Sequence, residues 1–325
     1  LAARPGACLV AGLSHRATVA DVDTAARAVT LVLSPFAPPA GTPVGLAAHD
    51  GPGFLGAIVA LRRAGLVALV LDCWSPRAER ERIAAALGAP VTLVCGTSWP
   101  RGPADWHAET QVLGREPVHL PGCAVIKLTS GSTGTPRGVA TRAEQLAADD
   151  DQLFRSMGLT DSDRLLSAVP LGHSYGLSSL ALPALRRGVP LIMPEPGSPF
   201  APLDIARREG ATFFPTTPAW LHALLRVAEP PPWPDTLRLT ISAGAPLGGE
   251  TAARFHGTFG RRVHTFYGSS ECGGICYDRE GGAAERGTVG EPVDGVRVEL
   301  VPFEDAATAE GMHGIVTVRS APAAP

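Results

Sequence analysis

The chain has 325 residues, which is enough for one large domain or two of ordinary size. Hydrophobic residues make up 45% and charged residues 18%, and the net charge of −3 gives no indication of a nucleic-acid-binding surface. The apolar runs are too short to span a bilayer, and the first residues lack the pattern of a signal peptide. Six cysteines without a CxxC pair predict free thiols in a reducing compartment, so we expect a cytoplasmic protein.

The first part of the chain alternates short apolar runs with amphipathic segments. Uninterrupted apolar strands between helices indicate a parallel sheet that helices cover on both faces. Residues 97–122 are rich in Pro, Gly and Trp without periodicity, so we expect them to form a connecting segment. The predicted elements are strands at 44–48, 67–71 and 91–94 and helices at 54–64 and 76–87.

The alternation restarts after residue 122, and after Gly287 it changes to short strands around a polar hairpin. We therefore expect two stacked α/β subdomains with mostly parallel sheets, residues 1–120 and 121–286, followed by a small β-rich subdomain, residues 287–325. The predicted elements are strands at 124–128, 165–169, 189–193, 212–214, 237–242, 263–266, 296–301 and 315–318, with a helix near 142–157 and further helices between the later strands.

A loop crowded with glycines and hydroxyls, LTSGSTGTPRGVA, occupies positions 128–140. It offers little apolar area to a core but many backbone amides, which can point inward together and bind an anion, helped by the positive end of the helix expected after the loop. Ser130, Ser132 and Thr133 add hydroxyl donors, and Arg137 adds a fixed charge suited to phosphate oxygens. The loop matches neither the Walker pattern nor GxGxxG, and it predicts a phosphate-binding site of another kind.

The segment 129–138 closely resembles the phosphate-binding signature of the adenylate-forming superfamily, which includes acyl- and aryl-CoA synthetases, peptide-synthetase adenylation domains and luciferases. The family pattern ends in Pro-Lys-Gly, whereas this chain has Pro-Arg-Gly. Lys127 is the only lysine of the chain, so Arg137 is interpreted as a substitution that keeps the charge. Three more segments resemble family elements in the family's order: Ser242–Leu247, Tyr267–Glu271 and Gly287–Pro292.

The resemblance implies a role for each matching residue. Tyr267 would stack on adenine, Ser270 would contact the α-phosphate and Glu271 would bind Mg²⁺, which carboxylate and phosphate oxygens commonly hold together. The implied catalytic residues are Glu271, Arg137 and His173. The implied nucleotide-binding residues are Thr129, Ser130, Gly131, Ser132, Thr133, Gly134, Tyr267, Ser270, Gly244 and Ala245. The implied substrate pocket is lined by His173, Ala243, Gly244, Gly268 and Gly273.

The implied reaction is the activation of a carboxylic acid with ATP and Mg²⁺. The carboxylate attacks the α-phosphate, pyrophosphate leaves, and a thiol of CoA or of the phosphopantetheine of an acyl carrier protein attacks the acyl-adenylate. Amino-acid-activating relatives place an aspartate shortly after the position of His173, but Ser174–Leu182 contains no acid. Because a buried ammonium without a partner is costly, we expect a non-amino acid, fatty or aromatic.

Gly172–Gly176 also matches the G-x-S-x-G nucleophile elbow of α/β-hydrolases, which would make Ser174 an esterase nucleophile. Pro170 argues against this alternative, because proline is poorly tolerated in a central strand, and no HGGG segment precedes the motif. The adenylate-forming family has a Pro-x-x-His-x-x-Gly element at the same place. The acid and histidine that an esterase would require could be Asp204 or Asp235 and His256 or His264.

A third alternative is a catalytically incomplete core that binds a nucleotide and an acyl group. Family members continue into a mobile C-terminal domain that supplies a catalytic lysine, whereas this chain has no lysine after Lys127. We therefore expect an N-terminal core without that domain, which would form adenylate very slowly.

Overall fold

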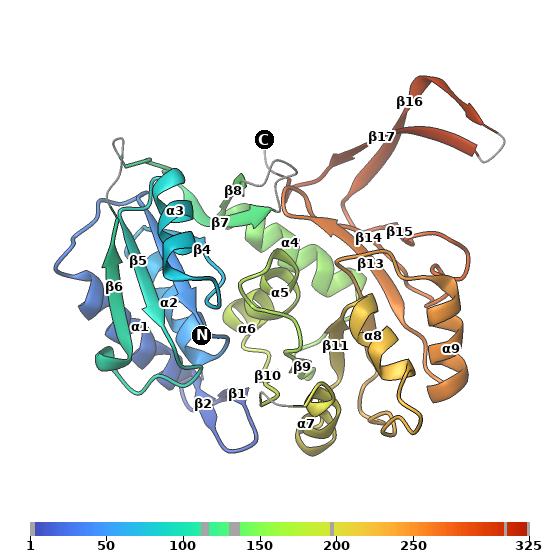
Figure 1. Ribbon diagram of the computed structural model, residues 1–325, viewed down its shortest axis with the longest axis horizontal. Coiled ribbons are helices and arrows are strands. Elements are labelled where there is room, and N and C mark those ends of the chain that lie inside the picture. Colours follow the sequence, from blue (N-terminus) through green and yellow to red (C-terminus); the bar gives the residue numbers. More distant parts are fainter. Residues whose placement is uncertain (1–3, 112–116, 130–136, 196–197, 309–310, 324–325) are drawn as a thin grey trace.

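The computed structural model describes residues 4–111, 117–129, 137–195, 198–308 and 311–323. Over these residues the protein is a mixed α/β structure with two mostly parallel sheets and a β-hairpin that projects from one end (Figure 1). The fold class predicted from the alternation of apolar strands and helices is confirmed.

Six of the described strands form the first sheet, whose central pairs are parallel and whose two edge pairs are antiparallel. Every residue of its two innermost predicted strands is buried, as expected of strands covered on both faces. In spatial order the strands are β6 (Trp106–Thr110), β5 (Val91–Cys95), β3 (Pro43–Ala48), β4 (Val67–Val70), β7 (Cys123–Thr129) and β8 (Arg137–Arg142).

Three helices cover this sheet: α1 (Val19–Leu33), α2 (Pro52–Arg63) and α3 (Arg77–Ala86). Alternate residues of β4 belong to different core clusters, Ala68 and Val70 to the one that includes α1 and α2, and Val67 and Leu69 to the one that includes α3. Because side chains alternate along a strand, α3 covers the face of the sheet opposite to α1 and α2.

Nine described strands form the second sheet, which is parallel in its middle and antiparallel at both edges. In spatial order they are β15 (Glu291–Pro292), β14 (Gly273–Tyr277), β13 (His264–Ser269), β12 (Leu239–Ser242), β11 (Phe213–Thr216), β9 (Leu165–Leu166), β10 (Leu191–Ile192), β1 (Cys8–Ala11) and β2 (Arg16–Thr18). The helices of this part are α4 (Ala143–Ser156), α5 (Ser174–Gly176), the π-helical turn η2 (Leu177–Ala181), α6 (Leu182–Arg187), α7 (Ala201–Glu209), α8 (Pro218–Leu225) and α9 (Gly249–Phe259).

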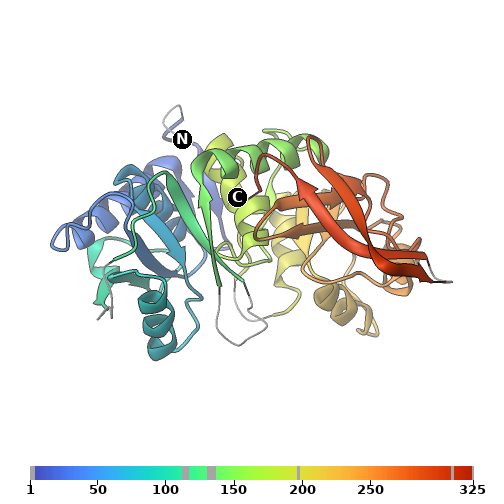
Figure 2. The same cartoon turned by 90° about the horizontal axis from the view of Figure 1, so that it is seen from above.

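The two sheets interleave along the sequence. β1 and β2 join the sheet of the later strands, whereas β7 and β8, which follow the predicted boundary at residue 120, complete the first sheet. Helix α4 contacts β7 and β8 of the first sheet and β14 of the second, so it bridges the two sheets (Figure 2). Each sheet therefore contains strands from both sides of residue 120. The division into subdomains at residues 120 and 286 stays a prediction.

Two predictions about the segments near the glycine-rich loop are wrong. The loop is followed by strand β8, which pairs antiparallel with β7, and not directly by a helix. The positive end of α4 therefore does not begin at the loop. Residues 97–122 are not a plain connection either, because they contain a one-turn 3-10 helix, η1 (Pro103–Asp105), and the edge strand β6. Only Trp106 and Glu109 of β6 are buried, and one of these two is charged, so the strand has a weak apolar signal in the sequence.

The chain after Pro292 forms the two-stranded sheet of β16 (Arg297–Thr308) and β17 (Gly311–Arg319), which is longer than the predicted strands. This hairpin extends away from both main sheets, with Leu300, Val301, Ile315 and Val316 exposed (Figure 1). The described end of the chain returns to α4, where Gln145 Nε2 donates to the carbonyl oxygen of Ala323 at 2.5 Å. Among the helices that the structure describes, none combines the length and the apolar character that crossing a membrane requires.

Candidate active site

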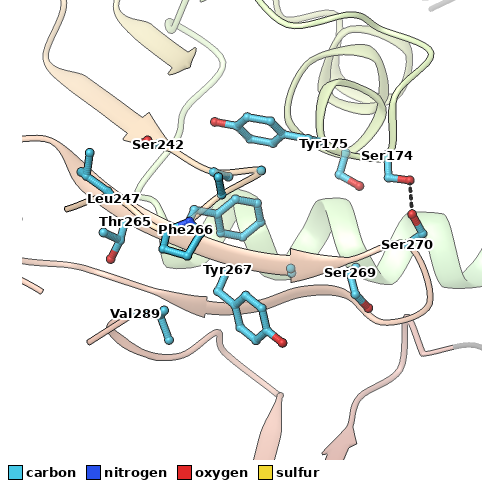
Figure 3. A pocket seen from close by; sticks show the side chains of 18 of the residues that line it. Ser174, Tyr175, Ser242, Leu247, Thr265, Phe266, Tyr267, Ser269, Ser270 and Val289 are labelled. Atoms are coloured by element: carbon cyan, nitrogen blue, oxygen red, sulfur yellow. Dashed lines mark hydrogen bonds between the residues drawn. The ribbon is translucent and has the colours of Figure 1, made fainter. Parts of the chain in front are cut away.

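A cavity of about 590 Å³ lies at the carboxyl ends of β12 and β13 (Figure 3). These two strands are parallel neighbours, so the segments that follow them meet at the same edge of the sheet. The cavity is also lined by the start of α5, the start of β14 and residues 287–289. Of the residues predicted for the site, its lining includes His173, Ala243, Gly244, Ala245, Tyr267, Gly268, Ser270 and Gly273.

The exposure of the lining residues changes from the mouth of the cavity to its floor. Tyr267 and Val289 are 41% and 43% exposed, whereas Ser178 and Ser242 are 6% and 2% exposed. A large planar group can therefore lie at the mouth against Tyr267, and the deeper end is screened from water.

Phe266 of β13 and Tyr175 of α5 form a wall of the cavity. Phe266 and Tyr267 leave β13 on opposite sides, as neighbours on a strand do, and the ring of Phe266 lies 5.9 Å from that of Tyr175 (Figure 3). The hydroxyl of Tyr175 donates toward the carbonyl oxygens of Thr216 at 3.2 Å and Ile241 at 3.4 Å. Burial raises the pKa of Tyr175 well above its ordinary value, so this phenol stays neutral and acts as part of the wall.

The turn after β13 is tied to the start of α5 by a hydrogen bond between Ser174 Oγ and Ser270 Oγ, which are 2.6 Å apart (Figure 3). His173 precedes α5 and is exposed, and its backbone carbonyl accepts from Leu177 N at 2.7 Å. The predicted pocket residue His173 and phosphate contact Ser270 therefore lie on two connected segments at one side of the cavity.

The floor of the cavity rests on a buried carboxylate that the sequence patterns did not identify. Asp149, on α4, accepts from Ser178 Oγ at 2.5 Å and from Gly274 N at 2.9 Å. Burial raises the pKa of Asp149, although both hydrogen bonds and the charge of Lys127 act to lower it. Burial lowers the pKa of Lys127, whereas the negative charges of Asp149 and Glu271 act to raise it. A buried lysine and a buried aspartate therefore lie within electrostatic reach of each other beneath the cavity.

The residues predicted for the phosphates are only partly within the described chain. Thr129 ends β7 and pairs with Arg137, the exposed first residue of β8. Ser130, Gly131, Ser132, Thr133 and Gly134 lie outside the described residues. Glu271 is exposed in the turn between β13 and β14, beside the cavity rather than in its lining, and its charge acts on Lys127.

A second cavity, of about 780 Å³, lies on the other side of His173, which lines both cavities. It is formed where β3 and β4 end and contains Asp50, whose Oδ1 accepts from Leu171 N at 3.0 Å. Burial raises the pKa of Asp50 to about 6, against this hydrogen bond. Nothing in the sequence pattern singled out Asp50, because a polar residue after a strand is common.

The chain belongs to the family of AMP-binding enzymes, whose model matches residues 2–324. It is 31% identical over 178 residues to a 4-hydroxybenzoate/benzoate–CoA ligase of Rhodopseudomonas palustris, covering 53% of this chain and 33% of that protein. The fold is similar to that of o-succinylbenzoate CoA synthetase from Bacillus subtilis in complex with its acyl-adenylate, with a TM-score of 0.82, 19% identity and coverage of 99% of this chain and 68% of that one. It is also similar to ATP-bound MatB from R. palustris, with a TM-score of 0.77, 21% identity and coverage of 99% and 68%.

The chain spans between about a third and a half of the length of the first curated relatives that it matches. Their names describe ligases and synthases that act on benzoate, hydroxybenzoate, sulfoacetate and feruloyl groups. Family membership and the fold therefore agree with the adenylate-forming superfamily that the four sequence segments resemble.

The contacts of Ser174 do not favour the hydrolase alternative. Its hydroxyl bonds to that of Ser270, which is not a base. The candidate base His264 has its Nδ1 2.7 Å from the backbone carbonyl oxygen of Asp278, and the other candidate, His256, is exposed on α9. The match to the family of AMP-binding enzymes includes the Pro170–Gly176 segment.

Proposed function

We propose that this chain is the nucleotide- and acyl-binding core of an enzyme that activates a non-amino carboxylic acid with ATP and passes the acyl group to the thiol of coenzyme A. The observation that carries the proposal is the cavity with an exposed Tyr267 at its mouth and buried small and aromatic residues toward its floor. A purine requires an aromatic surface such as Tyr267 at the mouth, and an acyl group requires a buried, mostly apolar pocket such as the floor.

In the proposed arrangement, adenine stacks on Tyr267, and the phosphates point toward Ser270, Thr129 and Arg137. The substrate carboxylate oxygen attacks the α-phosphorus, the bond to the bridging oxygen breaks and pyrophosphate leaves. The thiol then attacks the acyl carbonyl and AMP leaves. His173, between the two cavities, suits a position beside the carboxylate. The residues act by positioning and by stabilising phosphate charge, with no covalent enzyme intermediate.

Magnesium is proposed to be held by Glu271 together with phosphate oxygens. The carboxylate is exposed beside the cavity, and in the described residues no cluster of three or more His, Cys, Asp or Glu side chains could hold a metal without other ligands. One carboxylate that relies on substrate phosphates for the remaining ligands fits Mg²⁺ better than a metal caged by protein. Bound Mg²⁺ supplies neutralisation of the phosphate charge.

A benzoate-sized or fatty acid suits the proposal better than an amino acid. Helix residues after His173 contain no acid, and the buried Asp149 already has Lys127 as its counter-charge. The named aryl-CoA ligases among the relatives support an aromatic acid. A carrier protein as alternative acceptor and a cytoplasmic location stay predictions.

The test is isothermal titration of the chain with adenosine, ATP and benzoyl-sulfamoyladenosine, a stable analogue of an acyl-adenylate. We expect benzoyl-sulfamoyladenosine to bind at least tenfold more tightly than adenosine, because only the analogue fills both ends of the cavity. Pyrophosphate release over a panel of fatty, aromatic and amino acids then identifies the acid. Equal affinities for the analogue and adenosine, or release that depends on an amino acid, would contradict the proposal.

A further inference from the structure

Ser178 lies at the floor of the cavity, and the hydrogen of its buried hydroxyl is already engaged in a hydrogen bond. It lies four residues after Ser174, lines the same cavity and is 6% exposed. Its Oγ donates to Asp149 Oδ2 at 2.5 Å. A hydroxyl has one hydrogen and two lone pairs, so Ser178 can offer the cavity only an acceptor.

Asp149 holds this orientation because both of its oxygens are engaged as acceptors. Oδ1 accepts from Gly274 N at 2.9 Å, and Oδ2 accepts from Ser178. Asp149 is 2% exposed and lies directly behind Gly273, where any Cβ would collide with Oδ1. Burial raises the pKa of Asp149, whereas its two hydrogen bonds and the nearby cation of Lys127, 4% exposed, favour the ionised carboxylate, which has no hydrogen to give.

Not every hydroxyl of the lining imposes the same selection. Tyr175, in the wall, directs its hydrogen to backbone carbonyls and therefore also offers only an acceptor. Ser242 and Thr265 are buried and, in the described structure, make no hydrogen bond through their hydroxyls, so each can turn to donate or to accept. Ser178 is therefore the group of the floor that distinguishes a ligand donor from a ligand acceptor.

We infer that Ser178 accepts a hydrogen bond from the acyl part of the substrate, so that the preferred substrates are carboxylic acids carrying a hydroxyl or N–H group remote from the carboxylate. This inference rests on the proposed function and specifies its substrate class. Asp149 is a positioning residue that acts through Ser178, and Lys127 stabilises the charge of Asp149.

The test is the affinity of the chain for matched acyl-sulfamoyladenosines, measured by titration calorimetry. The acyl groups are benzoyl, the 3- and 4-hydroxybenzoyl isomers, the corresponding methoxybenzoyl isomers and 4-aminobenzoyl. We expect the better hydroxy isomer to bind about three- to tenfold more tightly than its methoxy counterpart, as one neutral hydrogen bond contributes. Because methoxy groups only accept, equal or tighter binding of the methoxy compounds would overturn the inference.

Ser178→Ala and Ser179→Ala form a matched pair of variants. Ser179 is the next residue, is 3% exposed, and its hydroxyl has no hydrogen-bond partner in the described structure and does not line the cavity. In Ser178→Ala the ratio of hydroxy to methoxy affinity should fall to about one, whereas Ser179→Ala should retain it. A ratio that survives in a folded Ser178→Ala variant would contradict the role of Ser178.

Asp149→Asn gives an independent readout that a structural role alone would not change. The asparagine carbonyl can still accept from Gly274 N, while its amide donates to Ser178 and releases the serine hydrogen toward the cavity. The preference should then shift toward methoxy compounds. If either variant fails to fold, the affinity ratio of the unsubstituted chain decides. Failure of every acyl-sulfamoyladenosine to bind would instead reject the proposed function.

Discussion

Ser174 and Ser270 lie 96 positions apart in the sequence, and their hydroxyl oxygens are 2.6 Å apart. The hydrogen bond joins the start of α5, which follows His173, to the turn after β13, the strand that carries Tyr267. The positions of the predicted carboxylate and nucleotide contacts are therefore coupled through this pair.

Ser174→Ala tests whether this serine is a structural contact or a nucleophile. We expect a loss of about 0.5–1.5 kcal/mol in the free energy of unfolding, from the hydrogen bond to Ser270, and pyrophosphate release within tenfold of the unsubstituted chain. Urea denaturation and a pyrophosphate assay measure both. Hydrolysis of p-nitrophenyl esters that disappears in Ser174→Ala would favour the hydrolase alternative instead.

Tyr267→Ala should weaken the binding of ATP by about 1–3 kcal/mol, if base–aromatic stacking has its usual strength. The side chain is 41% exposed, so the stability of the fold should change little. Titration calorimetry measures the affinity. Tyr267→Phe is the matched control because it keeps the aromatic face, and it should retain most of the affinity. An unchanged affinity in the alanine variant would refute the stacking role.

Glu271→Gln should remove the effect of Mg²⁺ on ATP binding, because an amide is a poor substitute for a carboxylate ligand. We expect the affinity of the variant for ATP to be the same with and without Mg²⁺, while the unsubstituted chain binds more tightly with it. Glu250→Gln, on the exposed side of α9, is the control for loss of one negative charge. If both variants keep the Mg²⁺ effect, another residue holds the metal.

Gly273→Ala should destabilise the fold by about 2–5 kcal/mol, combining strain and overpacking. Its φ is +72°, and a Cβ would collide with Asp149 Oδ1 behind the cavity. Gly257→Ala, in α9, is the control, because no atom lies within 4 Å of the added carbon. That helix substitution should stabilise by about 0.5–1 kcal/mol. Urea unfolding compares the two, and equal stabilities would show that Asp149 can move away.

Asp50→Asn should stabilise the protein increasingly as the pH rises from about 4 to about 6, and by a nearly constant amount at higher pH. The folded-state pKa of Asp50 is raised from 3.8 to about 6 by burial, so the folded chain holds this proton more tightly than the unfolded chain. The associated stability is fully present below pH 3.8 and is lost as the pH rises through about 6. The loss approaches about 3 kcal/mol, and asparagine avoids it while still accepting from Leu171 N.

The measurement is urea unfolding of both proteins at pH 4.5, 6 and 8. The stability difference should grow with pH. Asp161→Asn removes an exposed carboxylate and is the matched control, which should follow the unsubstituted chain at each pH because Asp161 is exposed. A constant difference between Asp50→Asn and the unsubstituted chain would show that Asp50 is not buried as a proton-binding group.

The sequence by itself determined the class of fold and the family. Buried parallel strands such as β3 and β4 appear as continuous apolar runs, and this local pattern predicts them without knowledge of their neighbours. The segments Ser242–Leu247 and Tyr267–Glu271 each follow or end a predicted strand. Because carboxyl ends of parallel strands meet at one edge of a sheet, their residues could be expected to share a pocket.

Only the tertiary structure decided which sheet each strand joins and what lies beneath the cavity. β8 (Arg137–Arg142) pairs with β7 to form a hairpin. Its residues have mixed exposure, so its sequence pattern does not distinguish a strand from a helix. Asp149 meets Ser178 and Gly274, which are 29 and 125 positions away, only because α4 bridges both sheets. An aspartate on an amphipathic helix has the same pattern whether it faces water or a cavity. Contacts between distant segments, and not local periodicity, made it part of the site.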